Sequence, residues 1–271
     1  MPQRPLKIVV PMAGRGSRFT DAGFTDPKPL IPLHGVPMIR LVIDNVRPAR
    51  PHRFVFICQR EHVAAYELER RLGEWAPGCA IVQLDGVTEG AACSVLAAAE
   101  HLDDGPLMIV NSDQYLDVSL DDHLDAAEGL DGMIMTMTAD DPKWSFVAVD
   151  GRGLATQVAE KAPISREATV GVYNFARGRD FTDAAREMIA RDLRVNGEFY
   201  VAPVYNMLIE KGARIGVRNI GTEAAGMYDL GSPAGLAVFL SLPISRRVAR
   251  ECAGSEVRRR VGRALERTSE P

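Results

Sequence analysis

Glycine and basic residues follow a short apolar segment near the start of the chain. Residues 8–10 are β-branched and apolar, which predicts a buried strand, and the loop after them contains Gly14 and Gly16. Glycine allows left-handed backbone conformations and lets several main-chain N–H groups approach an anion, as phosphate-binding loops do. Arg18 and Lys28 add positive charge within and after the loop. The segment is therefore predicted to bind a triphosphate.

The glycine spacing alone does not identify the kind of phosphate site. Phe19 stands where the dinucleotide-binding fingerprint needs a third glycine, and no Gly-Lys-Ser/Thr sequence follows as in a P-loop. A tight turn between a strand and a helix, with its basic side chains in solvent, would have the same local sequence. The loop by itself leaves both interpretations open.

Two aspartates, far apart in the sequence, each follow an apolar or aromatic segment. Asp113 comes after residues 107–110, which we expect to form a strand, and Asp229 comes after Met227 and Tyr228. Ligands of α/β sheets gather at the carboxyl ends of the strands, and Mg²⁺ prefers carboxylate oxygens. One such aspartate is often only a turn former. From their positions alone, each aspartate is a candidate magnesium ligand or a turn former.

The order of these motifs resembles the sugar-1-phosphate nucleotidyltransferase family, which includes glucose-1-phosphate thymidylyltransferase-like enzymes. That family opens with a G-x-G-(S/T)-R loop followed by a P-K-P or P-K-A lysine, and here the loop continues to Ser17-Arg18 and then to Pro27-Lys28-Pro29. Glu160-Lys161 is similar to the family's E-K motif, and residues 226–233 resemble its closing W-x-D-x-G-T-P. The resemblance extends from about residue 8 to residue 242.

The resemblance implies transfer of a nucleoside monophosphate from a nucleoside triphosphate to a phosphorylated acceptor, most often a sugar 1-phosphate, with release of pyrophosphate. It also implies a place in nucleotide-sugar and polysaccharide biosynthesis. By this resemblance, Arg18, Lys28 and Asp113 would be catalytic; Met12, Ala13, Gly14, Arg15, Gly16, Ser17, Gln83 and Gly90 would bind the nucleotide; Glu160, Lys161, Gly171 and Asn174 would bind the acceptor; and Asp113 and Asp229 would bind Mg²⁺.

One departure from the family pattern leaves the identity of the acceptor substrate undetermined. Many relatives have Tyr-Gly before a strand of the acceptor site, and this chain has Trp144-Ser145. A cytidylyltransferase acting on a non-sugar phosphate is therefore an alternative. A catalytically silent homologue that binds a nucleotide sugar and regulates a partner is another, although the presence of both aspartates and both motif lysines argues against it. Neither the nucleobase nor the acceptor follows from the sequence.

Alternating strands and helices must position these residues. Up to about residue 130 the pattern predicts strands at 53–58, 80–84 and 107–110 and helices at 38–46, 61–72 and 91–102. From residue 131 onwards it becomes strand-rich, with strands at 145–150, 154–161, 168–175 and 214–219 and helices at 178–191 and 200–211. We expect one α/β domain, residues 1–242, with a mostly parallel, Rossmann-like central sheet. By the resemblance this is a GT-A-like nucleotidyltransferase fold, with a nucleotide half (about 1–130) and an inserted acceptor-binding lobe (about 131–242).

Composition supports a folded protein that acts on small molecules. Of the 271 residues, 46% are hydrophobic and 25% are charged, which suits a full core. The formal net charge of −4 argues against general nucleic-acid binding. No apolar segment reaches the ~18 residues of a membrane-spanning helix and no signal peptide is evident, so a cytoplasmic location is expected.

Residues 243–271 form an Arg-rich extension beyond the resemblance. Its apolar residues near helical spacing, which predict an amphipathic helix, are Val248, Cys252, Val257, Val261 and Leu265. Such a helix packs on its own domain or forms a contact between the subunits of a homo-oligomer.

Overall fold

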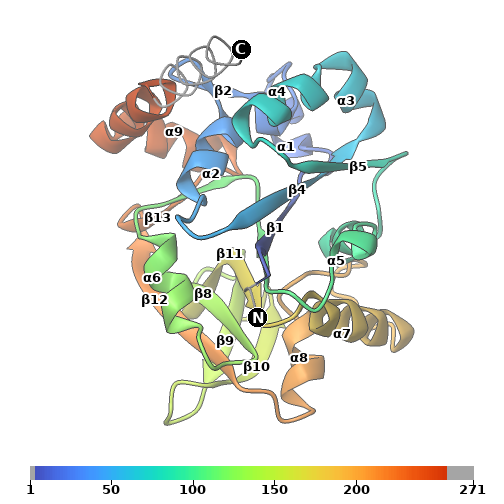
Figure 1. Ribbon diagram of the computed structural model, residues 1–271. Coiled ribbons are helices and arrows are strands. Elements are labelled where there is room, and N and C mark those ends of the chain that lie inside the picture. The colour runs from blue at the N-terminus through green and yellow to red at the C-terminus, as the bar shows by residue number, and fades with distance from the viewer. Residues whose placement is uncertain (1–3, 255–271) are drawn as a thin grey trace, which may run out of the picture.

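The strands of the nucleotide half form a parallel sheet. Figure 1 shows the computed structural model, in which residues 4–254 are described. The strands stand in the order β5 (Ala80–Leu84), β4 (His52–Gln59), β1 (Leu6–Pro11) and β6 (Leu107–Val110), and each neighbouring pair is parallel. The carboxyl ends of all four strands therefore lie along one edge, as the alternating sequence pattern predicted.

The acceptor half continues the same sheet instead of forming a separate one. β11 (Glu167–Phe175) pairs antiparallel with both β6 and β8 (Gly132–Thr138), and β12 (Ile215–Glu223) runs parallel to β8. β9 (Ser145–Val149) and β10 (Ala155–Glu160) form an antiparallel hairpin joined to β11. The strands of residues 132–175 thus form the strand-rich region that the sequence predicted, and its role as an inserted acceptor-binding lobe stays a prediction.

Two short strands bring the closing motif to the end of β6. β13 (Gly226–Asp229) pairs parallel with β12 and antiparallel with β7 (Gln114–Leu116). In this register Asp229 lies opposite Gln114, the residue that follows Asp113. Segments more than 100 positions apart in the sequence thus meet at one edge of the sheet.

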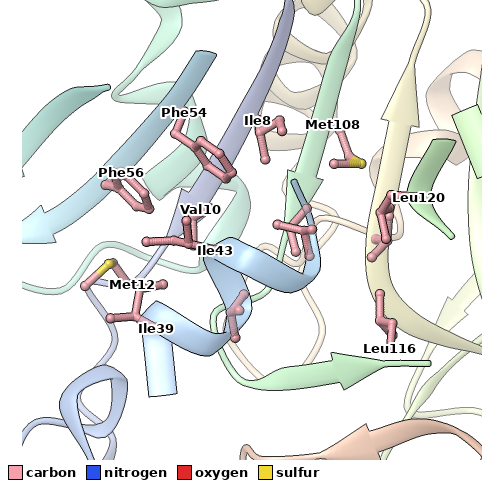
Figure 2. Close-up of a cluster of buried hydrophobic side chains, with 14 of the residues drawn as sticks. Ile8, Val10, Met12, Ile39, Ile43, Phe54, Phe56, Met108, Leu116 and Leu120 are labelled. Carbon is pink, nitrogen blue, oxygen red and sulfur yellow. The ribbon is translucent and has the colours of Figure 1, made fainter. Parts of the chain in front are cut away.

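Side-chain alternation along the strands produces a core on each face of the sheet. Ile8 and Val10 of β1 belong to one core cluster and Val9 to the other. The first cluster is covered by α2 (Met38–Asn45), α4 (Leu68–Trp75) and α6 (Leu120–Ala126), and the second by α5 (Ala91–Leu96), α7 (Gly178–Ala190) and α8 (Val204–Ile209). Figure 2 shows Ile39 and Ile43 of α2 beside Val10 of β1.

A third core cluster joins the segment after β1 to the end of the described chain. It packs α1 (Ser17–Asp21) and the residues after the short helix η1 (Lys28–Leu30) against α9 (Pro233–Ser241) and the helix at 243–254. Val248 and Cys252 are buried in it, so this part of the extension packs on its own domain. Val257, Val261 and Leu265 lie outside the described residues, and a contact between subunits stays a prediction.

Three predicted helices differ from those observed. Residues 61–72 form two helices, α3 (Arg60–Ala65) and α4, because Glu67 has a left-handed backbone (φ 51°) that an α-helix cannot continue. The helix predicted at 91–102 ends as α5 at Leu96 and is followed by a 3₁₀ turn, η2 (Ala99–His101). The helix predicted at 200–211 is the shorter α8. Within residues 4–254, no helix combines the length and apolarity needed to cross a membrane.

Candidate active site

The loop after β1 has a buried base and an exposed rim. The main-chain N–H of Met12 donates to the carbonyl oxygen of Ile57 at 2.9 Å, which attaches the loop to β4. Met12 and Ala13 are buried, whereas the loop residues Gly14, Arg15, Ser17 and Arg18 are exposed. The loop therefore presents main-chain and basic groups to solvent from a fixed base, as the prediction of a phosphate site requires.

Gly16 allows the loop to turn close to Lys28. Its φ of 65° is in the left-handed region, and it directly precedes α1. A β-carbon at this position would lie 3.2 Å from the β-carbon of Lys28, tighter than ordinary packing. Gly16 is thus required both by backbone conformation and by the approach of the lysine.

Lys28 connects this loop to the end of β6. Its ammonium Nζ lies 2.7 Å from Oδ2 of Asp113, and each of the two side chains is about one fifth exposed. The lysine expected near the triphosphate therefore forms an ion pair with the aspartate expected to bind the metal.

The carboxylates of Asp113 and Asp229 converge beside Gly231. A β-carbon on Gly231 would lie 2.6 Å from Oδ2 of Asp113 and 3.2 Å from Oδ1 of Asp229. The main-chain N–H of Leu230 donates to the carbonyl oxygen of Asp113 at 3.0 Å, which fixes the two segments together. Asp229 is further oriented by Gly231 N–H and Ser232 Oγ, each donating at 2.7 Å. The glycine leaves open the space that the two carboxylates face.

This pair of carboxylates fits a magnesium ion. Mg²⁺ takes one or two protein carboxylates and fills its other positions with water and substrate phosphates. Within residues 4–254, no group of three or more acidic, histidine or cysteine side chains forms a metal site, so a fully protein-made cage is not present there. Asp113 and Asp229 would hold the ion, and each of their oxygens keeps a lone pair beyond the hydrogen bonds it accepts.

Glu160 and Ser145 face each other across the β9–β10 hairpin. They are paired in register, and Ser145 Oγ donates a hydrogen bond to Oε2 of Glu160. Burial raises the pKa of the Glu160 carboxyl, and the hydrogen bond from Ser145 opposes that shift. The serine that replaces the usual glycine therefore acts directly on the glutamate expected to bind the acceptor.

Lys161 is held by an aromatic residue that the sequence had not singled out. Its Nζ donates to the hydroxyl of Tyr200 at 2.7 Å and lies 4.9 Å from the centre of the tyrosine ring. The hydrogen bond with Tyr200 is the main reason that the pKa of the lysine is raised. Lys161 is otherwise exposed and has a left-handed backbone (φ 54°). The lysine expected to bind the acceptor phosphate is thus already positioned.

Gly171 joins β11 to the turn that carries Asp113. A β-carbon on Gly171, whose φ is 75°, would lie 2.4 Å from both Nδ2 of Asn111 and Oε1 of Gln114. Its carbonyl oxygen accepts hydrogen bonds from the Asn111 main chain at 2.9 Å and from Gln114 Nε2 at 3.1 Å. The absence of a side chain at Gly171 therefore lets β11 pack closely against the turn that contains Asp113, and contact of Gly171 with the acceptor stays a prediction.

Tyr173 is a buried residue of β11 that sequence reasoning did not single out. Its hydroxyl is 3.0 Å from Oγ1 of Thr169. Burial raises the pKa of Tyr173, and the negative charges of Glu160 and Asp113 raise it further. A buried tyrosine in an apolar strand has the sequence signature of a core residue, so only the structure identifies this position.

Gln83 and Gly90, the expected nucleobase contacts, both make contacts within the protein. The Gln83 side chain lies 3.2 Å from Arg60 and 3.3 Å from Glu69. Gly90 has a φ of 136°, and a β-carbon there would lie 2.4 Å from the carbonyl oxygen of Phe199. Packing thus accounts for the glycine, and the reading of a nucleobase by either residue stays a prediction.

Asn174, an expected acceptor contact, is engaged inside the protein, and its binding of the acceptor stays a prediction. Asn174 pairs with Met108 inside the sheet, and its Oδ1 lies 2.7 Å from Nε2 of the buried His123. It also lines a cavity of about 420 Å³ together with Leu6 and Leu124. Asp113, Asp229, Glu160 and Lys161 are not among the residues that line this cavity. The register of β11 shifts between Thr169 and Tyr173, and Asn174 lies beyond that shift, away from the aspartates.

The chain matches a known domain family and longer curated proteins. The profile of a family described as MobA-like NTP transferase domain matches residues 8–173. Bifunctional protein GlmU of Burkholderia lata is 29% identical over 220 residues, which cover 78% of this chain and 46% of that protein. GlmU of Leifsonia xyli subsp. xyli is 30% identical over 224 residues, with coverages of 78% and 44%. The chain spans about half the length of the curated relatives it matches.

Solved structures share the fold. The nucleoside-diphosphate-sugar pyrophosphorylase from Vibrio cholerae RC9 has a TM-score of 0.76 and 28% identity, covering 87% of this chain and 100% of that chain. The inositol-1-phosphate CTP transferase from T. maritima has a TM-score of 0.69 and 15% identity, covering 91% of this chain and 97% of that one. At 15% identity, the likeness to the second of these structures concerns the fold alone. The expected central sheet with flanking helices is confirmed by these similarities.

Proposed function

The chain belongs to the MobA-like NTP transferase domain family, and on this basis we propose that it is a nucleotidyltransferase for a phosphorylated small molecule, with sugar 1-phosphates as the first acceptor class. A phosphate oxygen of the acceptor attacks the α-phosphorus of a nucleoside triphosphate. The bond between the α-phosphorus and the oxygen bridging to the β-phosphorus breaks, and pyrophosphate leaves. The reaction needs no covalent protein nucleophile; it needs two polyanions held in line and their charge neutralised.

The residues of the nucleotide half would bind and neutralise the triphosphate. The loop at 12–18 binds the phosphates through main-chain N–H groups and Arg18. Lys28 neutralises the leaving pyrophosphate. Asp113 and Asp229 would hold a magnesium ion, which would supply further neutralisation of phosphate charge.

The residues of the acceptor half would orient the second substrate. Lys161 binds its phosphate, and Glu160 accepts hydrogen bonds from its hydroxyl groups. We propose the cytoplasm as the compartment in which the two substrates are bound.

One observation carries the proposal: the convergence of the two carboxylates at Gly231 beside the ammonium of Lys28. Two carboxylates facing one space repel each other, and the ammonium of Lys28 offsets this repulsion at Asp113, so the site favours positive charge. A structural turn would need only one of the two aspartates.

A second candidate is a cytidylyltransferase for a polyol phosphate or another non-sugar phosphate. It is favoured by the hydrogen bond from Ser145 to Glu160, which uses part of the glutamate's capacity for a sugar hydroxyl. A structural relative named inositol-1-phosphate CTP transferase makes this alternative concrete. A silent regulatory homologue is the third candidate.

The test is a screen for pyrophosphate release. Five triphosphates (ATP, CTP, GTP, UTP, dTTP) are combined with hexose 1-phosphates, N-acetylhexosamine 1-phosphates and polyol phosphates, and pyrophosphate is detected through pyrophosphatase. We expect release that needs both substrates, with a best acceptor other than glucose 1-phosphate, because Ser145 replaces glycine. Asp113→Asn should abolish the release, while Asp117→Asn, an exposed aspartate nearby, should not. Binding of a nucleotide without any release would favour the silent homologue.

A further inference from the structure

Phe199 and Tyr200 lie between the loop before α5 and the acceptor lysine. The main-chain N–H of Phe199 donates to the carbonyl oxygen of Glu89 at 2.8 Å, and its own carbonyl oxygen accepts from Ala92 N–H at 3.0 Å. The next residue, Tyr200, binds Lys161. A direct chain of contacts therefore connects residues 88–92, in the nucleotide half, to Lys161, in the acceptor half.

Only glycine at position 90 permits this contact at its observed distance. A β-carbon on Gly90 would lie 2.4 Å from the carbonyl oxygen and 2.5 Å from the nitrogen of Phe199, both main-chain atoms that cannot easily move aside. The φ of 136° also excludes other residues. A movement of Gly90 is therefore transmitted to the Phe199 backbone.

Side chains stiffen the same connection. Arg194 forms an ion pair with Glu89 at 2.7 Å, and its guanidinium lies 4.2 Å from the centre of the Phe199 ring. Phe199 itself is fully buried. Arg194 thus holds the loop at 88–92 and the segment at 199–200 together, and it is not itself one of the proposed substrate-binding residues.

Tyr200 restrains a side chain that would otherwise be mobile. Lys161 is an exposed residue with a long, flexible side chain, and it contacts both the hydroxyl and the ring face of Tyr200. A lysine fixed in this way gives up less entropy when it binds a phosphate. The hydroxyl determines the direction of the ammonium, and the ring supports its position.

We propose that Tyr200 is a positioning residue for Lys161, and that the connection from Gly90 through Phe199 to Tyr200 couples nucleotide binding to acceptor binding. The inference rests on the proposed function. A nucleotide that holds the loop at 88–92 in this conformation also holds Tyr200 and Lys161 in theirs, so each substrate increases the affinity for the other by the same factor.

The positioning role is tested with Tyr200→Phe, which keeps the ring and removes the hydroxyl. A hydrogen bond to a charged group corresponds to roughly tenfold in affinity, so KM for the acceptor should rise about tenfold. The turnover number kcat and KM for the nucleotide should change less than about twofold. In a protein that already carries Lys161→Ala, Tyr200→Phe should have no further effect on KM for the acceptor. An unchanged acceptor KM, or an equal loss in all three parameters, would overturn the positioning role.

The coupling is tested without turnover, by calorimetry with an α,β-methylene analogue of the accepted triphosphate. In the wild-type protein, the analogue should tighten acceptor binding several-fold. Arg194→Ala should remove most of this gain, Arg194→Lys should restore part of it, and Arg191→Ala should leave it unchanged, because Arg191 pairs with Glu187 and Glu210 outside the connection. An equal gain in Arg194→Ala and wild type, or no gain in wild type, would overturn the coupling. If the screen finds nucleotidyl transfer but the variants do not show the expected changes in affinity, the inference alone is wrong. If the screen finds no nucleotidyl transfer, the proposed function is wrong.

Discussion

Lys28 and a divalent cation would both be attracted to the carboxylate of Asp113. The ammonium of Lys28 lies 2.7 Å from Oδ2 of Asp113, the oxygen that faces Gly231 and Asp229. The positive charge of Lys28 therefore opposes binding of a cation to the ligand-free site. In the nucleotide-loaded site the same charge would neutralise the leaving pyrophosphate.

We predict opposite effects of Lys28→Met on turnover and on metal affinity. Methionine keeps the packing against Gly16 but has no charge. The turnover number should fall by ~10²-fold or more, since one preorganised charge stabiliser contributes about 3 kcal/mol to catalysis. Mn²⁺ affinity of the ligand-free protein, measured by paramagnetic resonance, should increase several-fold. Near-wild-type turnover would remove Lys28 from the mechanism, and Lys143→Met, at an exposed lysine, serves as the control.

The two aspartates should contribute to one metal site. Asp113→Asn and Asp229→Asn each remove charge with little change in volume, so each should weaken Mn²⁺ binding to the nucleotide-loaded protein at least ~10-fold and abolish most turnover. Asp229→Asn should also lower stability by about 1 kcal/mol, because Asp229 accepts hydrogen bonds from Gly231 and Ser232. A variant whose metal dependence equals that of the wild type would show that its aspartate is only a turn former.

Residues in short local motifs could be predicted from the sequence, and those with distant partners could not. Lys28 and Asp113 belong to recognisable motifs, and the structure brings them together. Tyr200 gains its role only through contact with Lys161, 39 positions away. The irregularity of β11 near Gly171, beyond which Asn174 lies, cannot be recognised from strand alternation.

At the scale of elements, a buried histidine joins α6 to β11. His123 is fully buried, and its Nε2 lies 2.7 Å from Oδ1 of Asn174. Burial lowers the pKa of His123 to about 4 from its ordinary 6.5, and Arg218 contributes in the same direction. Between these two values the unfolded chain binds a proton that the folded chain does not, so stability increases with pH and is lost as the pH falls.

We predict that His123→Gln flattens the acid limb of the stability profile. The histidine should remove stability on the order of 3 kcal/mol between pH 6.5 and pH 4, and glutamine, which does not titrate, should not. Denaturant titrations at a series of pH values give the slope directly. An equal slope for the variant and the wild type would show that other groups cause the acid sensitivity.

Most strands could be predicted, but several helix limits could not. The strand at 80–84 was predicted at its observed limits, because apolar runs flanked by turn residues are a local signal. The interruption at Glu67 has no such signal, since glutamate is a good helix former. Phe199, directly before the helix predicted at 200–211, pairs through its backbone with Glu89 and Ala92, a tertiary contact, and α8 begins only after Pro203.

At the scale of the whole molecule, one sheet connects the two halves of the site. β11 pairs with β6 of the nucleotide half and with β8 of the acceptor half. The two halves should therefore unfold together, although each carries residues of a different proposed substrate site.

The two tryptophans of the chain test this cooperativity. Trp75 lies in α4 of the nucleotide half, and Trp144 directly precedes β9 of the acceptor half. In Trp75→Phe the fluorescence reports on Trp144, and in Trp144→Phe it reports on Trp75. In each variant, unfolding followed by fluorescence should be a single transition that coincides with the one followed by circular dichroism. The two variants should also have the same m-value. Fluorescence and circular dichroism transitions that separate within one variant would mean that the halves unfold independently.

The measurement that tests the central claim most directly follows the individual phosphates of the triphosphate. The accepted triphosphate is labelled with ³²P at either the α or the γ position and incubated with the acceptor, and products are separated by chromatography. Attack at the α-phosphorus predicts that the α label appears in the nucleotide-linked acceptor and the γ label in pyrophosphate, and that Asp113→Asn shows neither product. Transfer of the γ label to the acceptor, or its release as inorganic phosphate, would contradict nucleotidyl transfer.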